Sequence, residues 1–139
     1  MHTAEHILNQ TMVRMFGCPR SRNAHIERKK SKCDYQLAAC PTEAQLQELE
    51  HRVNEVIAQH LSVSYEFVKR NEVPPEVDLG KLPDDASETL RLVRIGDYDL
   101  CACVGTHVRN TSEIGTFKII SHDYNADTGS WRMRFKLLE

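Results

Sequence analysis

Two pairs of residues with metal-binding side chains lie about a hundred positions apart in this chain. His2 and His6 belong to the segment HTAEH, and Cys103 and His107 belong to the segment CVGTH. Three imidazoles and one thiolate match both the number and the kind of ligand that a tetrahedral Zn²⁺ ion prefers. The sequence therefore predicts a zinc site that two distant segments build together.

The spacing within each pair suits this chemistry. On a helix, residues four apart lie on one face a turn apart, so His2 and His6 can point at a common centre. Gly105 allows the backbone between Cys103 and His107 to bend, so that thiolate and imidazole can converge. Either motif alone is weak evidence, because histidine is as often a surface or core residue as a ligand. Both motifs in one short chain favour the metal site.

The remaining cysteines leave one alternative open. Cys101 precedes Cys103 by two residues, and residues two apart on a strand share a face, so Cys101 could coordinate instead. Only the four-residue step to His107 favours Cys103. Cys18, Cys33 and Cys40 are expected to be core or surface residues.

Length and composition predict a single domain over residues 1–139, large enough to bury a core without disulfides. The five cysteines have no framework spacing, and the given residues contain no long apolar segment; we expect no secretory leader. We therefore expect a cytoplasmic protein with no membrane partner.

A formal net charge of −2 gives no general basic surface, so we expect no DNA partner and only local contacts with RNA. Aromatic residues that could stack on single-stranded RNA are few. Two basic clusters could contact phosphates, although a solvated hairpin tip and an ordinary amphipathic strand explain them equally well. The first cluster is Arg20, Arg22, Arg28, Lys29, Lys30 and Lys32, and the second is Arg132, Arg134 and Lys136, which alternate with Trp131, Met133, Phe135 and Leu137.

Apolar periodicity predicts two main helices. The first extends from His2 to about Phe16 and ends at Gly17. The second follows Pro41, where Thr42 and Gln45 form a capping-box pattern before an apolar series at helical spacing.

The rest of the chain predicts strands. A hairpin is expected over residues 22–40, with its second strand over 33–39, and a half-buried strand is expected over 62–69. An irregular connector should occupy 71–87, strands 90–95 and 99–103 should follow, and a terminal hairpin should pair 115–122 with 130–138. Together, the predicted helices and strands indicate an α+β fold, in which two main helices pack on an antiparallel or mixed sheet.

With these motifs in place, the chain resembles the editing domain of alanyl-tRNA synthetase over nearly its whole length. HTAEH on an opening helix, CVGTHV, and the following segments RNTSEIG and FKI carry the resemblance. It is most similar to the free-standing AlaX-type editing proteins, and the same fold class also serves threonyl-tRNA synthetases.

The resemblance implies that His2, His6, Cys103 and His107 bind zinc. It also implies a hydrolase that deacylates mischarged tRNA of the alanine isoacceptor, Ser-tRNA or Gly-tRNA, which a small pocket cannot reject cleanly. Four protein ligands describe a closed site. Either one ligand is displaced during catalysis, or zinc positions the substrate and another group activates water.

Three further residues are candidates for the pocket. Thr106 and Glu113 are possible catalytic groups, and Thr106 and Asn23 are possible substrate-binding groups. Each also has a purely structural explanation: Thr106 as a turn hydroxyl, Glu113 as a surface acid and Asn23 as a loop amide. Val104 departs from the resemblance, because many relatives have glycine there, and a branched side chain could narrow the pocket.

Two other functions fit the same residues. A non-catalytic zinc module that binds tRNA or a synthetase would bind RNA without hydrolysis. A metal hydrolase of small esters or amides would act on free aminoacyl esters, and competing tRNA would not affect it.

Overall fold

The computed structural model describes residues 2–21, 23–27, 30–69, 89–102 and 107–138. These residues form helices and strands in an order close to the predicted one. The elements are α1 (His2–Phe16), β1 (Asn23–His25), β2 (Ser31–Gln36), α2 (Glu43–Ala58), β3 (Val63–Lys69), β4 (Thr89–Ile95), β5 (Asp99–Ala102), the 3-10 helix η2 (Thr111–Glu113), β6 (Thr116–Asn125) and β7 (Ser130–Leu138).

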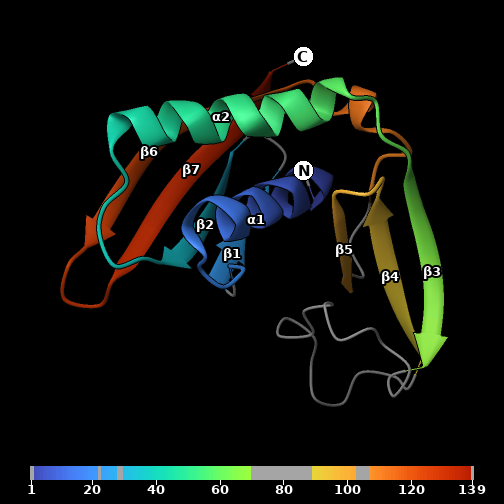
Figure 1. Ribbon diagram of the computed structural model, residues 1–139, viewed down its shortest axis with the longest axis horizontal. Coiled ribbons are helices and arrows are strands. Elements are labelled where there is room, and N and C mark those ends of the chain that lie inside the picture. The colour runs from blue at the N-terminus through green and yellow to red at the C-terminus, as the bar shows by residue number, and fades with distance from the viewer. Residues whose placement is uncertain (1, 22, 28–29, 70–88, 103–106, 139) are drawn as a thin grey trace.

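The strands form two antiparallel sheets, which confirms the α+β class but divides the expected sheet. One sheet has the order β1-β2-β7-β6, and the other has the order β3-β4-β5. The helix α2 crosses the four-stranded sheet, and α1 lies between the two sheets (Figure 1). The helix α1 contacts both α2 and β5. One side of α1 can therefore pack into the core while another side contributes to a functional site.

The predicted capping box at the start of α2 is confirmed. The Thr42 hydroxyl accepts from the Gln45 backbone N–H, and the Gln45 side chain accepts from the Thr42 N–H. These two bonds satisfy backbone donors that the first turn of a helix leaves without partners. Further along α2, Leu49 and Val53 are fully buried, so the apolar stripe that the sequence predicted faces the core.

The main core lies between the two helices and the four-stranded sheet. Its largest fully buried members include Ile7, Leu8 and Met12 of α1, Leu49 of α2, Phe117 of β6, and Trp131, Met133 and Phe135 of β7. The alternation predicted for β7 is therefore confirmed. The cations between these core residues face outward, where Arg132 and Arg134 bind Asp34 and Asp123.

The strand β3 departs from its prediction in one respect. The alternation of Val63, Tyr65 and Phe67 was expected to give a buried apolar face. Val63 does pack against the core, but Tyr65 is 43% exposed and Phe67 is 71% exposed. Two aromatic rings therefore lie at the surface where the sequence pattern predicted a covered strand.

Candidate metal centre and its supporting contacts

Three of the four predicted zinc ligands lie together at the first turns of α1. His2 and His6 come from that helix, and His107 comes from the segment that follows β5. The ring centroid of His107 lies 4.7 Å from that of His6 and 6.2 Å from that of His2. The predicted convergence of the two histidine motifs is thus present, although the sequence places them about a hundred residues apart.

The fourth predicted ligand, Cys103, lies outside the described residues, as do Val104 and Thr106. Within the described part of the chain, no set of three or more His, Cys, Asp or Glu side chains is arranged to hold a metal ion. The three imidazoles are nevertheless borderline donors whose rings are neighbours, and such donors suit zinc. The donor chemistry of the residues present therefore fits this ion.

A side chain of α1 fixes the orientation of His107. The Thr3 hydroxyl oxygen lies 2.8 Å from His107 Nδ1 and also accepts from the backbone N–H of Val108 at 3.3 Å. Because this contact involves Nδ1, coordination of a metal ion by His107 would use Nε2. Thr3 is only 1% exposed, so its position is set by packing as well as by these bonds.

The protonation state of His107 suits metal binding. Burial, the largest cause, together with the nearby His2 and Arg91 lowers the pKa of this imidazole to about 4. Burial has this effect because it disfavours the charged form of a histidine. His107 is consequently neutral at pH 7, which is the form that donates a lone pair to a metal.

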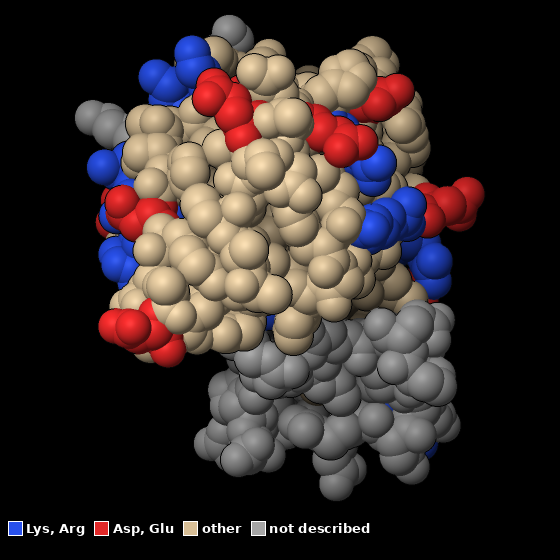
Figure 2. All heavy atoms as spheres, turned by 60° about the vertical axis from the view of Figure 1, so that its left-hand side comes forward, with Lys and Arg blue, Asp and Glu red and all other residues tan. Residues whose placement is uncertain are grey.

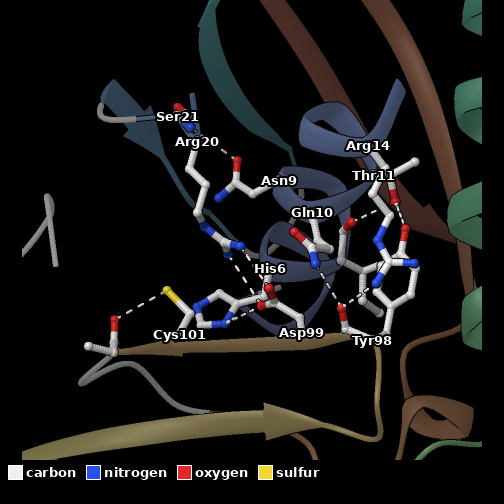
Figure 3. Close-up of polar contacts among 12 residues, drawn as sticks. His6, Asn9, Gln10, Thr11, Arg14, Arg20, Ser21, Tyr98, Asp99 and Cys101 are labelled. Carbon is white, nitrogen blue, oxygen red and sulfur yellow. Dashed lines mark hydrogen bonds and ion pairs between the residues drawn. The ribbon is translucent and has the colours of Figure 1, made fainter. Parts of the chain in front are cut away.

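His6 also lies next to a buried ion pair. Its Nδ1 lies 3.7 Å from a carboxylate oxygen of Asp99, the first residue of β5. Two N–H groups of Arg20 donate to the same carboxylate at 2.7 and 3.3 Å. Arg20 and His6 both point at the carboxylate of Asp99 (Figure 3). A carboxylate beside the second nitrogen of a ligating histidine is a common way to fix its ring.

Burial raises the pKa of Asp99 above its ordinary value, and the guanidinium of Arg20 opposes this rise. The side chains of Asp99 and Arg20 are 2% and 11% exposed. Arg20 was predicted to belong to a surface cluster for RNA phosphates. It is instead a nearly buried partner of Asp99, because the turn after α1 brings it back against β5.

The other members of the two basic clusters are dispersed. Lys30 and Lys32 are exposed, whereas Arg22, Arg28 and Lys29 lie outside the described residues. Arg132 and Arg134 bind acidic side chains, and Lys136 is partly buried on the same strand. On the face shown in Figure 2, charges of both signs surround a largely uncharged centre. The described surface in that view has no single basic face.

Glu113 caps a short helix, and Asn23 lies in a paired strand. The Glu113 carboxylate accepts the backbone N–H groups of Arg109 and Asn110 at 3.1 and 3.0 Å, which caps η2. Asn23 lies on β1, where its backbone pairs with Asp34, and the structure does not describe its side chain. Cys101 is buried on the face of β5 that carries Asp99, so it remains close to the histidines.

Sequence reasoning missed Thr3, Asp99 and the aromatic Tyr65, whose ring centroid lies 6.3 Å from that of His107. Thr3 could have been found, since it lies inside the first histidine motif. Asp99 and Tyr65 gave no signal, because their proximity to the histidines depends on how the sheet β3-β4-β5 packs beside α1 through β5.

Comparison with known proteins places these features in a family. Residues 90–131 match the "Threonyl and Alanyl tRNA synthetase second additional domain". The chain is 33% identical over 121 residues to the alanine–tRNA ligase of Thermoanaerobacter sp. (strain X514), and 31% identical over the same length to that of Bacillus subtilis (strain 168). In each case the match covers 86% of this chain and 14% of the relative.

The chain thus corresponds to a small part of the curated relatives that it matches. The α+β architecture agrees with that of a domain related to synthetase editing domains. The resemblance inferred from the two histidine motifs is confirmed: this chain is related to alanyl-tRNA synthetases through their second additional domain, as an AlaX-type editing-domain protein is.

Proposed function

We propose that this protein is a zinc-dependent hydrolase that deacylates tRNA of the alanine isoacceptor mischarged with serine or glycine. The observation that carries the proposal is the meeting of His2, His6 and His107 at the first turns of α1. The relationship to alanine–tRNA ligases supports a tRNA-related role for that cluster.

The residues around the cluster would hold it ready for a metal. Thr3 occupies Nδ1 of His107, and the carboxylate of Asp99 lies beside Nδ1 of His6. Arg20 holds that carboxylate through two hydrogen bonds. These contacts favour one ring orientation of His107 and of His6 before any metal binds, which would lower the entropy cost of forming the site.

His2, His6, His107 and Cys103 would hold the zinc ion. When bound, zinc would supply Lewis-acid polarisation at the ester. An aminoacyl ester is already an activated bond, so the protein needs no separate nucleophilic side chain. The chain's own contribution is to hold the imidazoles, with His107 neutral, and to position the tRNA end.

The test is a deacylation assay with Ser-tRNA, Gly-tRNA and Ala-tRNA of the alanine isoacceptor, using zinc-loaded protein. We expect release of serine or glycine and little release of alanine. His2→Ala is the informative variant, because this side chain is 40% exposed and its loss should leave the fold intact. Activity should fall at least about tenfold, since mutating even the partners of metal ligands typically costs about 10- to 100-fold.

His51→Ala is the matched control, since His51 is an exposed histidine on α2. It should leave deacylation unchanged. Failure of the zinc-loaded protein to release either amino acid, under conditions where an established editing domain does, would refute the proposal. Hydrolysis of free aminoacyl esters that added tRNA does not inhibit would indicate a small-ester hydrolase instead.

A further inference from the structure

The inner face of the three-stranded sheet continues past the histidine cluster as a surface of aromatic and cationic side chains. Tyr65 and Phe67 alternate on β3, so both point to the face that carries His107. Phe67 pairs in register with Arg91 of β4, and Tyr65 pairs with Val93. The guanidinium of Arg91 lies 4.7 Å from the centre of the Tyr65 ring. These three residues, Tyr65, Phe67 and Arg91, form what we call the aromatic platform.

The exposure of the platform is unusual for such residues. Phe67 is 71% exposed and Tyr65 is 43% exposed. By contrast, Phe117 and Phe135, which lie in the four-stranded sheet, are fully buried. Leaving two aromatic rings in water forgoes the free energy that burial would provide. A surface of this kind is often a binding site.

The charge of this face points to a nucleic acid. Lys69 lies on the same face of β3 as the two rings, and Arg91 lies on the facing strand. Glu66 belongs to the opposite face, where it binds Arg94 at 2.9 Å. On the described part of this face of β3 and β4, the charged residues are therefore cations. Aromatic rings on a sheet with neighbouring cations are the usual means of holding single-stranded RNA.

The short distance between Tyr65 and His107 indicates which part of an RNA the platform would bind. In an aminoacyl-tRNA the ester joins the amino acid to the ribose of the last nucleotide, so the base of that nucleotide lies close to the ester. The Tyr65 ring centroid lies 6.3 Å from that of His107. A base stacked on the platform would thus place its own ribose toward the candidate metal centre.

We propose that Tyr65, Phe67 and Arg91 bind the single-stranded 3′ end of the tRNA substrate. Phe67 stacks on a base, while Arg91, held over Tyr65, provides a charged plane for the neighbouring nucleotide. Two residues along a strand are roughly 7 Å apart. This spacing separates the Phe67 ring from the Arg91–Tyr65 pair enough for them to contact successive nucleotides. This assignment rests on the proposed function for its substrate, but it concerns binding rather than hydrolysis.

The test is a fluorescence-anisotropy titration of the whole protein with a labelled, uncharged oligoribonucleotide that ends in CCA. Phe67→Ala should weaken binding at least about fivefold, the smallest loss expected for one base–aromatic stack. Phe67→Trp should restore it, since a larger ring preserves the stack. Because Phe67 is exposed, neither change should disturb folding, and circular dichroism checks this directly.

Ser64→Ala is the matched control, because Ser64 is exposed on the same strand but faces the other side. It should leave the affinity unchanged. Arg91→Gln should weaken binding and reduce its dependence on salt. Equal affinity of wild type and Phe67→Ala would overturn the proposal, as would equal binding of a duplex of the same length. A dimer of this chain that Phe67→Ala dissociates would also overturn it, since a second copy would then cover the platform.

The two proposals fail separately. Platform-dependent RNA binding without deacylation would refute the hydrolase and leave the platform in place. Deacylation of mischarged tRNA with RNA affinity independent of Phe67 would refute the platform and leave the hydrolase in place.

Discussion

The contact between His6 and Asp99 shows how single side chains prepare the candidate metal centre. Asp99 lies 3.7 Å from His6 Nδ1 and is held by two hydrogen bonds from Arg20. Taking two charges into the interior is costly, and only close pairing offsets that cost. A buried pair placed at a histidine of the cluster therefore suggests a role in holding that ring rather than simple stabilisation.

Replacing Asp99 with asparagine tests this role. Asp99→Asn leaves Arg20 buried beside a neutral group, so we expect a destabilisation of about 3 kcal/mol in chemical denaturation. Zinc affinity, measured by competition with a chromophoric chelator, should fall about 10- to 100-fold.

Asp34→Asn serves as the control, because Asp34 binds Arg132 through two hydrogen bonds at a distant and more exposed position. It should leave zinc affinity unchanged. Unaltered zinc affinity in Asp99→Asn, with the fold retained, would show that the ion pair only stabilises the protein.

Among the elements, helices were easier to predict than the burial of strands. The capping box at Thr42 and the buried stripe of α2 depend on contacts within a few residues, so the sequence contains them directly. The exposed rings of Tyr65 and Phe67 depend on what covers β3, which local alternation does not specify. The division of the strands into two sheets likewise follows from the pairing of β7 with both β2 and β6.

The capping box gives a prediction at this scale. Thr42→Ala removes the hydroxyl that accepts the Gln45 N–H, so we expect a loss of about 1 kcal/mol in the free energy of unfolding. Thr42→Ser keeps the hydroxyl and should be nearly neutral. Thermal unfolding monitored by circular dichroism measures both. A neutral Thr42→Ala would mean that water replaces the cap without cost.

At the scale of the whole molecule, α1 connects the core to the candidate site. Ile7, Leu8 and Met12 pack into the core, while His6 and Thr3 face β5 and the segment that follows it. Within the described residues, no helix is long and apolar enough to span a membrane. The mixture of surface charges agrees with a net charge of −2 and favours local rather than general contacts with RNA.

The sequence predicted that His2, His6 and His107 would lie together, and their rings do, because the types and spacing of metal ligands are constrained by chemistry. Their role as zinc ligands stays a prediction. The sequence did not predict Asp99 or the reassignment of Arg20, since both depend on the approach of β5 to the turn after α1. Basic residues in a sequence show charge, but only the fold shows which of them already have an acidic partner.

We propose that the first turns of α1 and the distal Cys103–His107 segment hold one zinc ion jointly. Zinc K-edge X-ray absorption of the zinc-loaded protein tests it most directly, because sulfur and nitrogen ligands give shells at about 2.3 Å and 2.0–2.1 Å. We expect one zinc per chain with one sulfur and three nitrogen ligands, and loss of the sulfur shell in Cys103→Ala but not in Cys101→Ala. A protein that binds no zinc, or binds it through oxygen ligands alone, would contradict the account.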